Sequence, residues 1–260
     1  MPNANELINL NKSNKTIKKN NHEIKPIFII GVPRCGPTLI EKIIGSGSQT
    51  ISVGEETRII GNFIPAKVLE KQSLNLGNVE DLRNELFKIY KDKGLISKKY
   101  NFTFTDKSLD NFFYLKLIKE IYPNAKIIHC KRNVLSSIMS IFQNNLSALA
   151  WTHDLKHIFK YFDNYLRIIN NFNKIYPNFA YELEYEKLVT NPEIESKKLM
   201  KFCELPWDKK CLEFYKRKDL ISKTASNIQI RQAIYKHSVD KYLPYKKFLG
   251  NYRNKYQWFN

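Results

Sequence analysis

The sequence predicts an α/β fold of three layers, in which helices flank both faces of a central parallel sheet. Three short stretches have the length and apolar content of buried strands: Ile27–Gly31, Ala125–Cys130 and Phe179–Tyr185. Segments with apolar residues at helical spacing alternate with them, at Thr38–Ile44, Asn111–Ile121, Val134–Phe142, His153–Asn173 and Pro192–Cys203. Because alternating strands and helices are typical of parallel sheets covered on both faces, this order predicts the architecture.

The 260 residues fit one large domain with enough length to bury a core. Residues 1–24 are polar and rich in lysine and asparagine, and we expect a mobile tail there. The domain is predicted to run over residues 25–260, with an irregular basic segment after Lys209. No internal repeat or linker divides it.

The formal net charge is +18 at pH 7, and lysine and arginine are spread along the whole chain. Such a charge is typical of proteins that bind nucleic acid or anionic membranes, and a non-catalytic binding protein of that kind stays an alternative. No recognisable nucleic-acid-binding module accompanies the charge, so we expect no nucleic-acid partner. The preferred interpretation is a generally basic surface that attracts a multiply anionic small ligand.

Cysteine usage and hydropathy bear on the compartment. Four cysteines stand at positions 35, 130, 203 and 211, and none forms a CxxC or a Cys/His metal spacing. The N-terminus lacks the apolar core of a signal peptide, and no apolar run reaches the roughly 20 residues that span a bilayer. These features predict a cytoplasmic protein with reduced thiols and no transmembrane segment.

The first predicted strand leads through a short loop into a helix, an arrangement that builds an anion site. The first N–H groups of a helix lack intrahelical partners, and the helix dipole adds partial positive charge there. Gly36 lets the backbone approach a ligand, Arg34 has forked donors for one phosphate, and the Thr38 hydroxyl adds another donor. Pro37 removes one backbone donor but suits the first helical turn.

This loop is not a Walker A sequence, which requires a lysine directly after its second glycine. Gly31, Gly36 and Thr38 fit the Walker spacing, but Pro37 stands where the lysine is required. An ATPase or GTPase is therefore disfavoured. A nucleotide-dependent phosphotransferase that uses the same strand, loop and helix stays open as an alternative.

Two motifs together resemble the sulfate-donor site of sulfotransferases. PRCGPT, Pro33–Thr38, resembles the family's 5′-phosphosulfate loop PRSGTT, which binds 3′-phosphoadenylyl sulfate (PAPS). HCKRNVLSSIMS, His129–Ser140, is similar to the 3′-phosphate motif, in which an arginine follows a buried strand and a serine stands eight residues later. Arg132 and Ser140 fill those two places, after the strand expected to neighbour the first, and the helix between them brings both toward one phosphate.

Further motifs narrow the resemblance to the tyrosylprotein sulfotransferases and to bacterial sulfotransferases often fused to TPR repeats. GEETRII at Gly54–Ile60 matches the former group. Both groups share TDK, YPNAK, YEKLVTNPE, FCELPWD and TASNIQIRQAIYKHSVDKY, at Thr105–Lys107, Tyr122–Lys126, Tyr185–Glu193, Phe202–Asp208 and Thr224–Tyr242. The likeness runs from Pro26 to about Leu249. It implies a P-loop-like sulfotransferase fold and PAPS-dependent sulfuryl transfer to a hydroxyl, with adenosine 3′,5′-bisphosphate (PAP) as product.

The resemblance also implies the partners of the reaction. Peptidyl tyrosine is one acceptor, and a glycan, a lipid or a small hydroxylated molecule is equally open. Contacts to the acceptor are expected in loops over residues 61–99 and 144–152, which carry no motif. Transfer is expected to be metal-free, because arginines and lysines supply the positive field.

In-line sulfuryl transfer needs a base at the acceptor hydroxyl and positive charge at the departing oxygen. The resemblance assigns the base to Glu56 and stabilisation of the bridging oxygen to Lys107, with the hydroxyl of Ser226 assisting. Many small-molecule sulfotransferases use a histidine base, and this chain has His22, His129, His153, His157 and His237. His129 lies in a buried-strand pattern and is expected in the core, and none of the five clearly outranks Glu56.

The residues that hold PAPS follow from the same resemblance. The 5′-phosphosulfate is assigned to Arg34, Cys35, Gly36, Pro37 and Thr38, the 3′-phosphate to Arg132 and Ser140, and the adenosine end to Tyr185. A segment expected to fold over the nucleotide contributes Ser226, Gln229, Ile230, Arg231 and Tyr235, and Lys241 adds charge. Three residues depart from the family pattern, since Cys35 replaces a serine, Pro37 a threonine and Asn133 a common aspartate.

Overall fold

The computed structural model describes residues 4–11, 24–100, 102–144, 146–217, 231–235, 239–240 and 242–259. Its main sheet is parallel, in the order β4-β2-β5-β6, with bounds β2 (Lys25–Ile30), β4 (Thr103–Asp106), β5 (Lys126–Lys131) and β6 (Ala180–Glu184). The three predicted strands are confirmed, with small shifts at their ends. Strands β2 and β5, which precede the two phosphate motifs, are direct neighbours, with Ile29 opposite Ile128.

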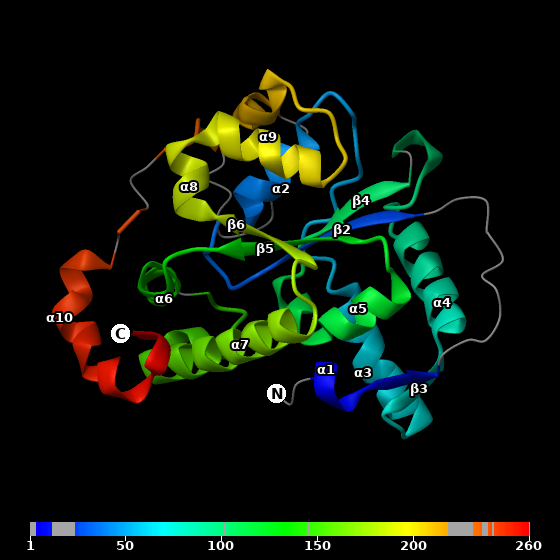
Figure 1. The fold of residues 1–260 in the computed structure, drawn as a ribbon, viewed down its shortest axis with the longest axis horizontal. Coiled ribbons are helices and arrows are strands. Elements are labelled where there is room, and N and C mark those ends of the chain that lie inside the picture. The colour runs from blue at the N-terminus through cyan, green and yellow to red at the C-terminus, as the bar shows by residue number, and fades with distance from the viewer. Residues whose placement is uncertain are drawn as a thin grey trace.

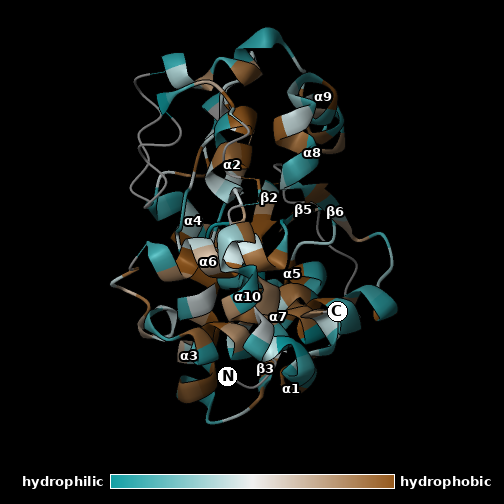
Figure 2. Cartoon of the chain, turned by 90° about the vertical axis from the view of Figure 1, so that its left-hand side faces the viewer, coloured by the Kyte–Doolittle hydropathy of each residue, from teal (hydrophilic) through white to brown (hydrophobic). Residues whose placement is uncertain are grey.

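Helices cover both faces of this sheet, as predicted, with α2, α8 and α9 on one face and α5, α6 and α7 on the other (Figure 1). Figure 2 shows hydrophobic residues gathered where strands and helices meet, and hydrophilic residues on the outer turns. No described helix combines the length and hydropathy needed to cross a bilayer. The helices are α1 (Ala4–Leu7), α2 (Pro37–Gly45), α3 (Ile59–Lys71), α4 (Val79–Asp92), α5 (Leu115–Ile121), α6 (Val134–Gln143), α7 (Leu155–Ile175), α8 (Tyr185–Thr190), α9 (Pro192–Phe202) and α10 (Lys246–Leu249).

Strand β4 goes beyond the sequence prediction, because its residues TFTD contain no apolar run. All four are nevertheless buried. Burial of polar groups is costly unless they form hydrogen bonds, and here they do. Asp106 accepts from the hydroxyls of Tyr90 at 2.7 Å and Thr57 at 2.8 Å, and from the Ser108 N–H at 3.0 Å.

The stretch 61–99, expected to be loop, instead contains most of α3, then β3 (Asn75–Asn78) and α4. Helix α3 escapes detection because it has almost no one-sided apolar pattern and contains Pro65. Helix α4 buries Leu82, Leu86 and Tyr90 at intervals of four residues, a signal that the sequence does carry. The expectation of a motif-free loop is therefore wrong for this stretch.

Part of the predicted N-terminal tail has regular structure. Helix α1 is followed by β1 (Asn9–Asn11), which pairs in parallel with β3 through Asn9 and Asn75. The Asn5 side chain donates to the Phe112 carbonyl at 3.0 Å and accepts from the Lys116 N–H at 2.8 Å. Residues 4–11 thus contact the domain, whereas residues 12–23 lie outside the described part of the chain.

The Tyr90 hydroxyl provides a test of how much the buried Asp106 network stabilises the fold. Tyr90 is fully buried, its ring 4.8 Å from that of Phe104. We expect Tyr90→Phe to lower the free energy of unfolding by about 1–3 kcal/mol, because a buried carboxylate loses a donor. Urea unfolding measures this change.

Tyr122→Phe is the matched control. The Tyr122 hydroxyl is also buried, but it has no hydrogen-bond partner among the described residues. Its removal should change the free energy of unfolding by no more than about 0.5 kcal/mol, or raise it, because no bond is lost. Equal destabilisation by the two substitutions would contradict this account of the network.

Candidate active site

The carboxyl ends of the four parallel strands deliver four groups of the predicted site to one edge of the sheet. Lys107 follows β4, the loop 31–36 follows β2, Arg132 follows β5, and Tyr185 follows β6. In open parallel sheets, ligands bind in the crevice outside the carboxyl ends of the strands. The structure therefore brings together residues that are more than 150 positions apart in the sequence.

The loop 31–36, which we call the phosphate loop, has backbone conformations that few residue types adopt. Arg34 has φ 69° and Gly36 has φ 96°, directly before α2 begins at Pro37. A Cβ atom at Gly36 would lie 2.5 Å from Cδ2 of Tyr185, so only glycine lets this ring pack against the loop. The Cys35 side chain is fully buried, and the Cys35 carbonyl accepts from the Cys130 thiol at 2.9 Å.

The two arginines assigned to the two phosphates lie beside each other. Arg34 Nε donates to Ser140 Oγ at 3.2 Å, and Arg132 Nη1 donates to the Arg34 carbonyl at 2.7 Å. The Arg132 guanidinium also lies over the Tyr185 ring, 4.9 Å from its centroid, a cation–π contact. Four residues predicted from three motifs thus form one connected group.

The positive charges of Arg34 and Arg132 favour the binding of an anion. Arg34 is 9% exposed, and burial lowers its pKa, with the positive charge of Arg132 lowering it further. An anion between two partly desolvated guanidinium groups relieves both effects. Asn133, where an aspartate is common, caps α6 through its side-chain oxygen, which accepts from the Ser136 N–H at 2.9 Å.

Lys107 and Glu56 form the second half of the site. Lys107 is fully buried, and its Nζ lies 3.6 Å from Oε1 of Glu56, which is 38% exposed in its side chain. Arg58 Nη2 lies 3.7 Å from the other oxygen of Glu56. The Lys107 ammonium makes no hydrogen bond within the described part of the chain. A buried ammonium without hydrogen bonds is costly unless a ligand receives them.

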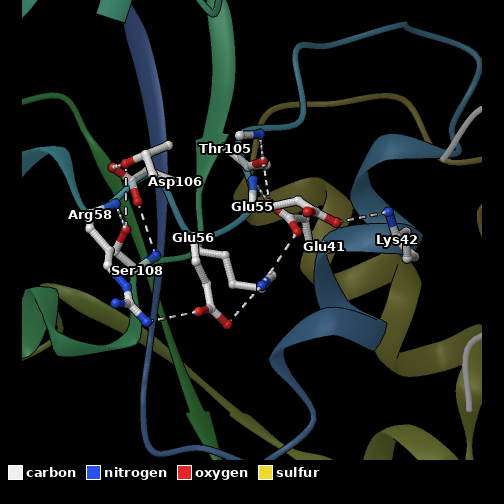
Figure 3. A network of polar contacts seen from close by, with 11 residues as sticks. Glu41, Lys42, Glu55, Glu56, Arg58, Thr105, Asp106 and Ser108 are labelled. Atoms are coloured by element: carbon white, nitrogen blue, oxygen red, sulfur yellow. Dashed lines mark hydrogen bonds and ion pairs between the residues drawn. The ribbon is translucent and has the colours of Figure 1, made fainter. Parts of the chain in front are cut away.

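The segment GEETR is fixed by β4. The Gly54 N–H donates to Thr105 Oγ1 at 3.1 Å, and the Lys107 N–H donates to the Glu55 carbonyl at 2.8 Å. A Cβ atom at Gly54 would lie 2.2 Å from the Thr105 carbonyl oxygen, so glycine is needed for this approach. Figure 3 shows the resulting network, with Glu56 and Arg58 turned toward each other. The motifs GEETR and TDK are thus joined by hydrogen bonds into one local structure.

Sequence reasoning overlooks Glu41, which lies at the centre of this network (Figure 3). It is fully buried on α2, and its Oε1 accepts from Thr105 Oγ1 at 2.7 Å and from the Glu55 N–H at 3.0 Å. Burial raises the pKa of Glu41, while Lys107 and the Thr105 hydrogen bond oppose that rise. The available signal is an acidic residue that Lys42 follows directly, in a helix whose other positions after Thr38 are apolar or glycine.

A cavity of about 1230 Å³ opens beside the phosphate loop and Glu56. Arg34, Pro37, Thr38 and Glu56 line one side, and η3, the 3-10 helix Ala150–His153, with α7 lines the other. Trp151 and Tyr161 stack there with centroids 3.9 Å apart and 7° between their planes. The cavity is large and its lining mixes aromatic, charged and amide groups.

The positions of the other titratable residues narrow the choice of a catalytic base that could replace Glu56. His129 is buried on β5, as expected, where its Nε2 bonds to the Tyr165 hydroxyl and its Nδ1 lies 3.5 Å from Glu182. His157 lines the cavity and is the histidine to weigh against Glu56. Asp110 also lines it, and burial raises its pKa, a candidate that sequence reasoning missed. His22 and His237 lie outside the described residues.

The segment predicted to fold over the nucleotide lies mostly outside the described residues, among them Ser226, Gln229, Ile230 and Lys241. Arg231 and Tyr235 are described. Tyr235 is close enough to Arg34 to affect its pKa electrostatically, so this end of the segment approaches the phosphate loop.

A family model described as "Sulfotransferase family" matches residues 26–209. The chain belongs to the sulfotransferase family, which confirms the resemblance found in its motifs. An uncharacterized protein of Aquifex aeolicus (strain VF5) is 36% identical over 238 residues, 86% of this chain and 31% of that protein. Protein-tyrosine sulfotransferase A of Caenorhabditis elegans is 26% identical over 72% of this chain and 51% of its own length. The chain thus spans from a third to a half of these two relatives.

Solved structures agree on the fold. The sulfotransferase domain of the Synechococcus PCC 7002 olefin synthase superposes with a TM-score of 0.61, covering 88% of this chain and 91% of that domain at 18% identity. The sulfotransferase domain from the curacin biosynthetic pathway gives 0.60, covering 85% and 91% at 17% identity. The chain therefore has a sulfotransferase fold.

Gly36→Ala tests the close packing of Tyr185 on the loop. We expect it to lower the free energy of unfolding by about 1–2 kcal/mol from the left-handed backbone, and by a further 1–3 kcal/mol or so from the clash with the ring. Gly94→Ala is the matched control, because Gly94 has φ 74° and no atom within 4 Å of the added Cβ. Urea unfolding compares them, and equal losses would mean that the ring contact contributes nothing.

Proposed function

We propose that this chain transfers a sulfuryl group from PAPS to a hydroxyl acceptor, without a metal, with Glu56 as the base. The observation that carries the proposal is the convergence of Arg34, Arg132, Ser140 and Tyr185 at the carboxyl ends of β2, β5 and β6. Membership of the sulfotransferase family supports it.

The residues present fit the donor. Arg34 and the N-terminus of α2 would hold the 5′-phosphosulfate, and Arg132 with Ser140 the 3′-phosphate, because each group offers directed N–H or O–H donors. Because Gly36 has no side chain, the Tyr185 ring packs directly on the loop, where it would contact the adenosine end. The buried Lys107 ammonium, without a hydrogen bond inside the described residues, fits an oxygen that gains negative charge.

The chain's own groups divide the chemistry between them. Glu56 is partly exposed at the cavity, so its carboxylate can receive the proton of an acceptor hydroxyl. Lys107, 3.6 Å away, would stabilise the departing phosphate oxygen. Ser226 is proposed to assist at that oxygen, and Gln229, Ile230, Arg231, Tyr235 and Lys241 to cover the nucleotide.

The acceptor is proposed to enter the cavity between the phosphate loop and α7. Its volume of about 1230 Å³ exceeds what a small ligand needs, so an extended acceptor is accommodated. Peptidyl tyrosine is one such acceptor, supported by relatives named as protein-tyrosine sulfotransferases. A glycan, a lipid or a small hydroxylated molecule fits the same chemistry.

Calorimetry with PAP tests the 3′-phosphate assignment. We expect Arg132→Ala to weaken PAP binding at least tenfold, because a charge-assisted hydrogen bond contributes about 1.5–3 kcal/mol. Lys131→Ala is the matched control, because it removes the neighbouring positive charge. The Nζ of Lys131 pairs with Glu182 at 2.9 Å. Affinity unchanged by Arg132→Ala, or Mg²⁺-dependent turnover of ATP without PAP binding, would overturn the proposal in favour of a phosphotransferase or another anion-binding function.

Base assignment is tested by three substitutions. Glu56→Gln should bind PAP as the native chain does and lower sulfuryl transfer by about 10²–10⁴-fold, because it removes the proton acceptor. Assays use ³⁵S-labelled PAPS with a panel of tyrosine peptides, glycans and phenols. His157→Asn and Asp110→Asn, whose residues also line the cavity, serve as rivals. A larger loss of turnover in either rival than in Glu56→Gln would move the base to that residue.

A further inference from the structure

Glu41 belongs to the site by contact, although none of the roles proposed above uses it. It lies on α2, one turn after the phosphate loop, and its side chain is fully buried. A fully buried carboxylate is rare unless something holds its charge. The residues that contact Glu41 indicate the role of its carboxyl group.

One oxygen of the carboxylate is immobilised. Oε1 accepts from the Thr105 hydroxyl at 2.7 Å, which comes from β4, and from the Glu55 N–H at 3.0 Å, which comes from the GEETR segment. Two donors from two different segments fix both the position and the rotation of the carboxyl group. The other oxygen, Oε2, is therefore aimed by the fold and not by its own flexibility.

Oε2 lies 3.9 Å from Lys107 Nζ, and both atoms are buried without a hydrogen bond to any described residue. The second carboxylate near this ammonium is Glu56, at 3.6 Å. Neither distance is a hydrogen bond, so the ammonium is held by charge on two sides while its three donors stay available for a ligand oxygen.

Burial raises the pKa of Glu41, and the charges of its neighbours act on this rise in both directions. Lys107 and Lys42 are the cations that lower its pKa against the effect of burial, whereas Glu55 raises it. Lys42 Nζ is itself held 3.7 Å from Glu55 Oε1, a contact drawn in Figure 3. Glu41 thus faces Lys107, and Glu55 faces Lys42.

We propose that Glu41 is the positioning residue for Lys107: its immobilised carboxylate holds the ammonium beside the phosphate loop and prevents it from closing onto Glu56. The catalytic meaning of this role rests on the proposed function. Because Glu41 is on the helix that begins at the phosphate loop, it also ties the cation at the departing oxygen to the residues that hold the donor. Without it, Glu56 is the nearest remaining carboxylate, and a tight pair would occupy both groups.

The test uses the full chain labelled with ¹⁵N-lysine, and follows the Nζ signal of Lys107, assigned by its loss in Lys107→Arg, at one fixed pH. We expect Glu41→Gln to displace that signal clearly from its native position, because a charged group at 3.9 Å is lost. Glu55→Gln, the matched control, should leave the signal near its native position, because that carboxylate faces Lys42.

Glu41→Asp keeps the carboxylate but withdraws it, so a Lys107 signal between those of the native chain and Glu41→Gln is expected, and this variant serves if Glu41→Gln does not fold. An unmoved Lys107 signal in Glu41→Gln, or equal shifts in Glu41→Gln and Glu55→Gln, would overturn the positioning role. PAP calorimetry on the same samples separates the two proposals. An unmoved signal with native PAP binding removes the role of Glu41 alone, and a native chain that does not bind PAP removes the proposed function instead.

Discussion

The site depends on the parallel order of four strands, because parallel strands place all their carboxyl ends at one edge of the sheet. Ladder pairing fixes the relative positions of these ends, with Phe28 opposite Asp106 on one side of β2 and Ile30 opposite His129 on the other. The groups that follow are therefore set by backbone hydrogen bonds before any side chain contributes. Their mutual contacts, such as Arg132 to the Arg34 carbonyl, adjust positions that the sheet has already chosen.

The site also concentrates charge where water is scarce. Arg34, Glu41, Lys42 and Lys107 are each 9% exposed or less, and buried ion pairs rarely stabilise a fold more than apolar side chains of the same size would. A ligand with several negative charges, such as the donor proposed above, would bind only the folded chain and would offset part of this cost by mass action.

The wall of the cavity differs in character from the phosphate side. Strand ends and backbone donors form the phosphate side, whereas η3 and α7 form the wall, with stacked Trp151 and Tyr161 beside polar groups of α7. Residues near the C-terminus pack against α7, since Trp258 donates to Asp163 at 3.1 Å and the Tyr252 ring stacks on Phe159. The two sides of the cavity are therefore built from different elements of the fold.

The sequence by itself determined the fold class, the three strands with apolar runs and the family, because these depend on local patterns and ordered motifs. It also named most of the residues that meet at the sheet edge, such as Arg34, Arg132 and Ser140. Only the tertiary structure determined that β4 is a strand. Its polar residues can be buried because the hydroxyls of Tyr90 and Thr57, from other segments, donate hydrogen bonds to Asp106. It alone revealed Glu41, since a buried carboxylate on α2 is interpretable only when its partners, Thr105 and Lys107, are known. Those partners are 64 positions or more away in sequence, and no local pattern encodes such a contact.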